Sequence, residues 1–98
     1  MTITKNQQDT NLTVALEGRL DTTTAPQLEA EINGSIAGVT ELVLDFEKLE
    51  YISSAGLRVL LAAQKIMNKQ GEMKLIHVCD DIKEVFDITG FADILTVE

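Results

Sequence analysis

The chain has 98 residues, and its 16 acidic residues outnumber the 8 basic ones, which gives a formal net charge of −8 at pH 7. This length suits one modest core, so we expect a single domain over residues 1–98. The acidic balance argues against nucleic acid and anionic membrane surfaces as partners, because both are negatively charged. No apolar run approaches the roughly 20 residues of a membrane-spanning helix. The N-terminus is polar, and we expect a cytoplasmic protein with no membrane insertion.

The first residues predict two strands that lie close enough in sequence to pair antiparallel. Residues 2–6 form a weak strand, and residues 7–11 read as a polar turn. Residues 12–17 alternate apolar and polar side chains, as a half-buried strand does. We expect Gly18 to end that second strand.

A helix is predicted after this hairpin. Thr24 is a suitable N-cap because Gln27 follows three residues later, and Pro26 falls in the first turn, where its missing N–H does no harm. We expect the helix to end at Gly38. The residues expected on its buried face are Leu28, Ile32 and Ile36.

The centre of the chain predicts a buried strand followed by the longest helix. Residues 42–46 are apolar with one acid, which is typical of a central strand covered on both faces. A helix over residues 54–70 is closed by Gly71. Between Tyr51 and Gly71 there are three basic residues and no acidic one. At 100° per residue, one side of the helix forms a solvent-facing stripe of Ser54, Arg58, Ala62, Lys65 and Lys69.

The last third predicts a strand, a short helix and an edge strand. Residues 73–78 form the strand, and Asp81 is placed to cap a helix that Gly90 ends. Residues 94–97 are expected to form the edge strand. Cys79 is the only cysteine, and we expect it to be a small buried hydrophobe. The helix residues expected to point inward are Ile82, Val85, Phe86 and Ile88.

This order of elements predicts an α/β domain. Alternating strands and helices after an opening hairpin imply right-handed crossovers and a mixed, mostly parallel sheet of about five strands with helices packed on it.

The sequence offers little for catalysis, so we expect no enzyme, no cofactor and no metal. His77 is the only histidine and lies in a predicted strand. Ser54 lacks the Gly-x-Ser-x-Gly elbow of hydrolases, because Ile52 stands where the first glycine belongs. The pair Asp80-Asp81 is interpreted as a helix cap. Neither zinc-ligand spacing nor a phosphate-cradling glycine loop is present.

Two adjacent serines, Ser53 and Ser54, stand where the longest helix is expected to begin. The first turn of a helix has N–H groups without internal partners and carries the positive end of the macrodipole. A serine in this position can cap the helix, accept a phosphate, or do both. The local pattern leaves these alternatives open.

Five short segments are spread over nearly the whole chain. They are Gly18-Arg19-Leu20-Asp21, Thr24-Ala25-Pro26, Leu44-Asp45-Phe46 with the run to Tyr51, Ser53-Ser54-Ala55-Gly56-Leu57 and Phe86-Asp87-Ile88-Thr89-Gly90-Phe91. In this order and spacing, they make the chain resemble an anti-sigma-factor antagonist of the STAS domain family.

The resemblance implies one small domain with helices mainly on one face of a mixed sheet. It also implies a partner switch. The unphosphorylated antagonist binds an anti-sigma factor, commonly a serine kinase, and thereby frees the sigma factor. The kinase then phosphorylates a serine at the start of the second helix, which ends the binding, and a serine phosphatase resets the cycle.

The family motif Asp-Ser-(Ser/Thr)-Gly-Leu falls on residues 53–57 of this chain. By this resemblance Ser54 is the phosphoacceptor. Ser53 stands where the family most often has Asp, and it becomes the second choice of acceptor. Ala55 replaces the second hydroxyl.

We expect the partner to contact the surface around this helix start. Gly56 either lets a partner backbone approach closely or packs against the sheet. The predicted partner-binding residues are Asp21, Thr22, Thr23, Ser53, Ser54, Gly56 and Arg58. Two alternatives remain: a constitutive STAS scaffold or regulatory module that is not phosphorylated, and a small nucleotide- or ligand-binding domain that uses the helix N-terminus as an anion site.

Overall fold

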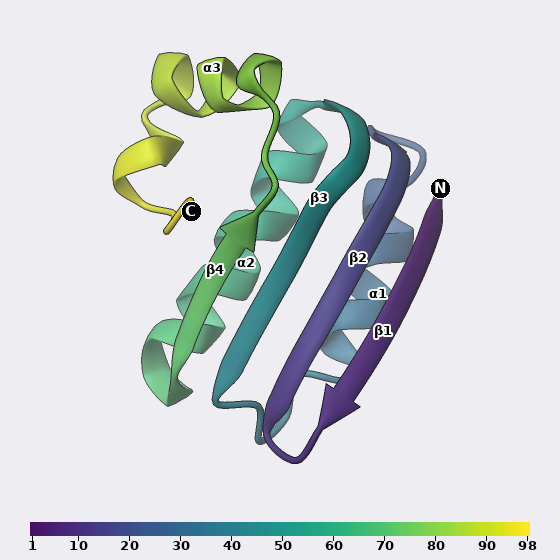
Figure 1. Ribbon diagram of the computed structural model, residues 1–98, viewed down its shortest axis with the longest axis vertical. Coiled ribbons are helices and arrows are strands. Elements are labelled where there is room, and N and C mark those ends of the chain that lie inside the picture. Colours follow the sequence, from purple (N-terminus) through teal and green to yellow (C-terminus); the bar gives the residue numbers. More distant parts are fainter.

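The computed structural model describes residues 1–98 and contains one four-stranded sheet with strand order β1-β2-β3-β4 (Figure 1). β1 (Thr2–Gln8) pairs antiparallel with β2 (Asn11–Leu20). β2 pairs parallel with β3 (Glu41–Ile52), and β3 pairs parallel with β4 (Glu72–Ile76). The predicted α/β class and the mixed, mostly parallel sheet are confirmed.

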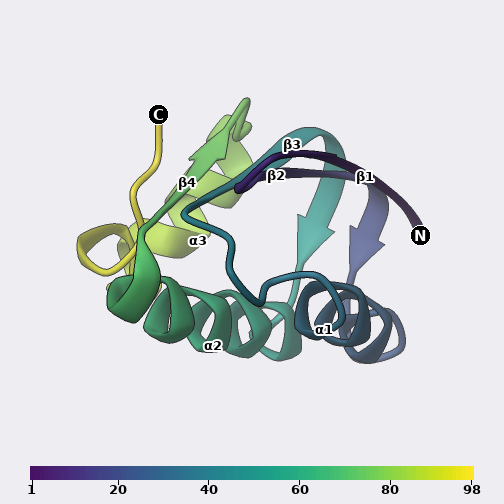
Figure 2. The same ribbon diagram turned by 90° about the horizontal axis from the view of Figure 1, so that it is seen from below.

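Two of the three helices cover a single face of this sheet. α1 (Ala25–Asn33) and α2 (Ser54–Gln70) lie side by side beneath it, and the opposite face has no helix over it (Figure 2). α3 (Asp80–Thr89) lies beyond the end of β4, and the 3-10 helix η1 (Phe91–Asp93) leads the chain back alongside β4 (Figure 1). No helix is long and apolar enough to span a membrane.

The core lies between the sheet and the two helices. It is one cluster of 25 buried apolar residues, and Phe46, Leu28 and Leu60 within it are fully buried. Each such side chain stabilises the fold by roughly 1.5–3 kcal/mol through removal of apolar surface from water. The position of the core therefore fixes α1 and α2 against one face of the sheet.

The prediction that the central strand is covered on both faces is wrong. β3 buries alternate residues, and Val43 and Asp45 between them are only partly buried. Its apolar run therefore describes a strand with one face on the core and one face on the open side of the sheet. Asp45 belongs to this open side.

β3 is longer than the five residues predicted. Its second half was not predicted, because two irregularities in its pairing with β2 interrupt the alternation of buried and exposed side chains. Its pairing with β2 shifts register twice, once between Ala15 and Glu17 and once between Gly18 and Arg19. Each β-bulge inserts an extra residue in one strand and changes which side chains face inward. The buried residues of β3 after Phe46 are accordingly spaced by three: Phe46, Leu49 and Ile52.

Several predicted boundaries differ from the structure. Gly18 does not end β2 but lies at one of the register shifts, with a φ of +107°. The polar turn shrinks because β1 runs on to Gln8. α1 ends at Asn33, with Gly34 as its C-cap, and does not reach Gly38. Ile36 is nevertheless buried, as predicted, in the loop that follows.

The C-terminal third departs most from the sequence patterns. The predicted fifth strand is a single parallel bridge between Leu75 and Val97. α3 begins at Asp80, so that Cys79 and not Asp81 is its N-cap residue. Cys79 is exposed rather than buried. Ile88 was predicted to point inward but is 77% exposed. The buried residues of this short helix are Ile82 and Phe86 alone.

Candidate partner-binding and phosphorylation site

The predicted site forms where two parallel strands end at the same edge of the sheet. β2 and β3 remain paired to their last residues, Leu20 and Ile52. The backbone N–H of Ser53 then donates to the carbonyl oxygen of Leu20 over 2.9 Å. Since α1 follows β2 and α2 follows β3, both helices begin at this edge (Figures 1 and 2).

The two serines have opposite environments. Ser53 is the N-cap residue of α2 in an extended conformation, and its carbonyl oxygen accepts the N–H of Leu57 over 3.0 Å. Its hydroxyl makes no capping bond and is buried without a hydrogen-bond partner. Ser54 is the first residue of the helix and is exposed. Of the two, only Ser54 therefore offers an accessible hydroxyl.

Gly56 lies beneath this surface and not on it. It is buried, and a Cβ atom added there would come within 2.6 Å of Leu20 Cγ and 2.9 Å of Ile52 Cγ1. These distances are shorter than van der Waals contact, so the first turn of α2 can seat against the ends of β2 and β3 only with glycine. The geometry thus favours the packing alternative for Gly56.

The loop before α1 is held by Asp21. Its Oδ1 accepts the backbone N–H groups of Thr23 over 3.0 Å and of Thr24 over 3.1 Å. The hydrogen bond from Thr24, offset in part by burial and strengthened by Thr23 and the Arg19 charge, lowers the pKa of Asp21 below its usual 3.8. Thr22 and Thr23 between these anchors are exposed.

Thr24 is the N-cap residue of α1, as predicted, but the predicted capping box does not form. The Thr24 hydroxyl donates to the carbonyl oxygen of Arg19 over 2.7 Å and accepts the N–H of Asp21 over 2.9 Å. Its side chain therefore closes the loop instead of capping the helix.

The loop and the start of α2 share a shallow hollow of about 280 Å³. Arg58, one turn after Ser54, lies on its rim and is exposed. The remaining residues of the predicted solvent-facing stripe on α2 are exposed as well. The hollow is lined by Thr22, Ala25, Pro26, Glu29, Ala55, Arg58 and Val59.

One feature of this edge was not predicted from the sequence. The guanidinium of Arg19 stacks on the ring of Tyr51, with 4.2 Å between its carbon and the ring centroid. The two residues are register partners in β2 and β3. Because the sequence pattern ended both strands too early, nothing in it indicated that these side chains would meet.

The comparisons with known proteins agree with this architecture. The family model of the STAS domain matches residues 2–98 of this chain. The chain belongs to the STAS domain family. BtrV of Bordetella bronchiseptica, named as a candidate anti-sigma factor antagonist, is 41% identical, with 99% of this chain and 85% of that protein covered. The anti-sigma-B factor antagonist of Staphylococcus aureus is 29% identical, with 99% and 92% covered.

The fold is also that of the Bacillus cell fate determinant SpoIIAA, which is 21% identical. The structure of its unphosphorylated form matches with a TM-score of 0.79, covering 99% of this chain and 87% of that one. The phosphorylated form matches with a TM-score of 0.77, covering 99% and 91%. The fold of this STAS domain is thus similar to both forms.

We expect Gly56→Ala to destabilise the STAS domain by about 1–3 kcal/mol, because the added methyl group overpacks the contact with Leu20 and Ile52. Alanine favours an exposed helix by about 1 kcal/mol over glycine, so helix propensity alone predicts the opposite sign. Urea unfolding followed by circular dichroism measures the difference. A variant at least as stable as the wild type would contradict the packing role.

We expect Asp21→Ala to destabilise the domain at pH 7 and to do so less as the pH falls. The folded pKa of Asp21 is lowered, so its ionised form contributes stability above the unfolded value near 3.8, and this contribution is lost as the pH falls through the lower folded value. Unfolding curves at pH 7 and below pH 4 measure the change. Asp87→Asn is the control, because that carboxylate makes no hydrogen bond, and a constant difference across pH would count against the argument.

Proposed function

We propose that this STAS domain is an anti-sigma factor antagonist. In its unphosphorylated form it binds an anti-sigma factor that is a serine kinase, and phosphorylation of Ser54 ends that binding. The observation that carries the proposal is the contrast between the exposed Ser54 and the buried hydroxyl of Ser53 at the start of α2. The names of BtrV and of the Staphylococcus aureus relative support the antagonist role.

The proposed docking surface extends from Ser54 to the loop before α1 and along α2. Thr22 and Thr23 contribute the loop between β2 and α1, and Arg58 continues the surface along α2. A basic stripe on a chain with a net charge of −8 favours a partner that presents acidic groups to α2. Residues Asp21, Ser53 and Gly56 shape this surface from within through the contacts described above.

The physical effect of a phosphate at Ser54 favours a switch at the contact surface and not within the fold. A phosphoserine adds about −1.5 to −2 charges. The positive end of α2 stabilises such a charge by roughly 0.3–1 kcal/mol, so the domain stays folded. Burial of the same charge against a partner without a matching cation costs several kcal/mol, and each 1.4 kcal/mol is about tenfold in affinity. Only the complex is then lost, and a serine phosphatase restores it.

The role needs no chemistry from the STAS domain itself. The kinase and the phosphatase supply the covalent steps, and the domain supplies an acceptor hydroxyl and a surface. The proposed sequence of events takes place in the cytoplasm, where sigma factors act.

Ser54→Asp is expected to weaken binding to the anti-sigma factor at least about tenfold, while its thermal unfolding midpoint stays close to that of the wild type. Ser54→Ala should bind normally and take no phosphate, whereas Ser53→Ala should still be phosphorylated on Ser54. Calorimetric titration with an anti-sigma factor of the serine-kinase type from the same organism measures affinity, and fragmentation mass spectrometry after incubation with that kinase and ATP locates the phosphate. Normal binding by Ser54→Asp would instead indicate a constitutive module, and phosphate on Ser53 would contradict the assignment.

Reversal of charge at Arg58 tests the docking surface separately. Arg58→Glu is expected to slow association and to weaken the dependence of binding on salt, because a basic group on the contact surface steers an acidic partner. Lys69→Glu is the matched control: it makes the same charge change on the same exposed stripe, about 16 Å further along α2 at 1.5 Å per residue. Equal effects of the two variants would show that only net charge matters.

A further inference from the structure

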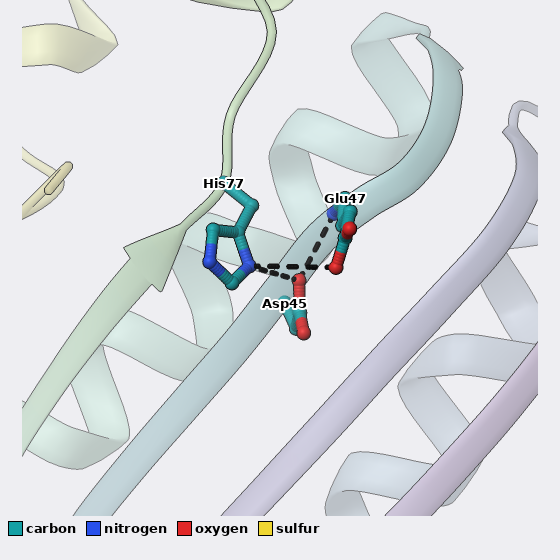
Figure 3. Close-up of side chains that lie close together, drawn as sticks. All are labelled: Asp45, Glu47 and His77. Carbon is teal, nitrogen blue, oxygen red and sulfur yellow. Dashed lines mark hydrogen bonds and ion pairs between the residues drawn. The ribbon is translucent and has the colours of Figure 1, made fainter.

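A second group of polar side chains gathers on the open face of the sheet, opposite the face that α1 and α2 cover. Asp45 and Glu47 come from β3, and His77 follows the end of β4 (Figure 3). His77 Nδ1 lies 2.9 Å from Asp45 Oδ1 and 3.9 Å from Glu47 Oε2. One nitrogen or oxygen atom from each of the three residues lies within 4.8 Å of the other two.

The backbone holds these side chains together. Asp45 is the register partner of Ile76 in the parallel pair of β3 and β4, so His77 emerges directly beside it. His77 has a φ of +56°, which turns the chain out of the strand and directs the ring towards β3 (Figure 3). The N–H of Glu47 donates to Asp45 Oδ1 over 3.0 Å and fixes that carboxylate.

The three groups form a donor set suited to a metal ion. Around one ion bonded at about 2.0–2.2 Å, neighbouring ligand atoms lie roughly 3–4 Å apart, which matches the two distances from His77. Two carboxylates supply charge, and an imidazole selects zinc and related transition metals over calcium and magnesium, which prefer oxygen ligands alone. The pKa of His77 is raised by its hydrogen bond to Asp45, so an ion competes with a proton for Nδ1.

There is also room for solvent ligands. Asp45 and Glu47 border a hollow of about 250 Å³ on the open face, with Glu17 and Lys48 as the other charged groups beside it. The side chains of His77 and Glu47 are 56% and 68% exposed, so both can adjust to an ion that enters from solvent.

We propose that Asp45, Glu47 and His77 bind a single divalent transition-metal ion of the zinc class on the open face of the sheet. Water completes the coordination. The ion joins β3 to the connection between β4 and α3, two segments that are distant in sequence. The site is separate from the proposed partner-binding surface, which lies at the carboxyl ends of β2 and β3.

Titration of the untagged protein with Zn²⁺, followed by calorimetry and by amide and imidazole NMR, tests the site. We expect one ion per chain, with shifts centred on the three residues, and no comparable response to Mg²⁺. Removal of a group that only hydrogen-bonds to a metal ligand weakens metal binding about 10–100-fold. His77 is proposed as a direct ligand, so His77→Asn should weaken Zn²⁺ binding at least about tenfold. Asparagine tolerates a positive φ, which keeps the backbone of the variant folded. Glu47→Gln, at an exposed position, should also weaken binding.

Two controls separate this site from other zinc ligands. Cys79 is an exposed thiol two residues after His77, and Cys79→Ser should leave the affinity unchanged. Glu84→Gln removes a carboxylate from α3 without touching the cluster and should have no effect. Bound Zn²⁺ should raise the thermal midpoint of the wild type and not that of His77→Asn, because it binds only the folded site. No one-to-one binding, binding unchanged in His77→Asn, or binding lost in Cys79→Ser would each overturn the proposal.

Discussion

The parallel pairing of β2 with β3 is the constraint on which the rest of the domain depends. The pairing continues to the last residues of both strands and is closed by the hydrogen bond from Ser53 N–H to the Leu20 carbonyl. This places the starts of α1 and α2 at one edge, and both helices lie on the same side of the sheet (Figure 2). Without that register, the loop of Asp21 and the exposed Ser54 would belong to separate surfaces.

The extent to which the sequence predicts this arrangement differs between helices and strands. α2 was predicted with its observed bounds, because its apolar period is regular and Gly71 follows directly. The second half of β3 was missed, because two register shifts replace the period of two by buried residues three apart. The fifth strand was overpredicted, since Ile94 to Val97 contribute only one bridge to β4. A local sequence pattern indicates which side chains one helix or strand buries. It does not indicate the register between two strands, because that register depends on tertiary packing.

The same distinction applies to the two proposed sites. The position of Ser54 at the helix start follows from local signals, and the exposure of the α2 stripe follows from its period. The burial of the Ser53 hydroxyl could not be predicted, because it depends on how closely α2 seats against β2 and β3. The meeting of His77 with Asp45 requires both the β3–β4 register and a left-handed residue at the strand end.

Under the proposed function, the seating of α2 also determines what the kinase would recognise. Ser54 belongs to a hydrogen-bonded helical turn, with its neighbours Ser53 and Gly56 fixed against the sheet, and not to a flexible tail. A kinase that modifies it must accept a folded substrate and read residues that are brought together from separate segments, such as Thr22 and Arg58. Recognition of this kind rejects unfolded chains and short peptides of the same sequence. It would also give switches of the proposed kind in one cell a means to remain independent, because each kinase would be matched to a surface and not to a linear motif.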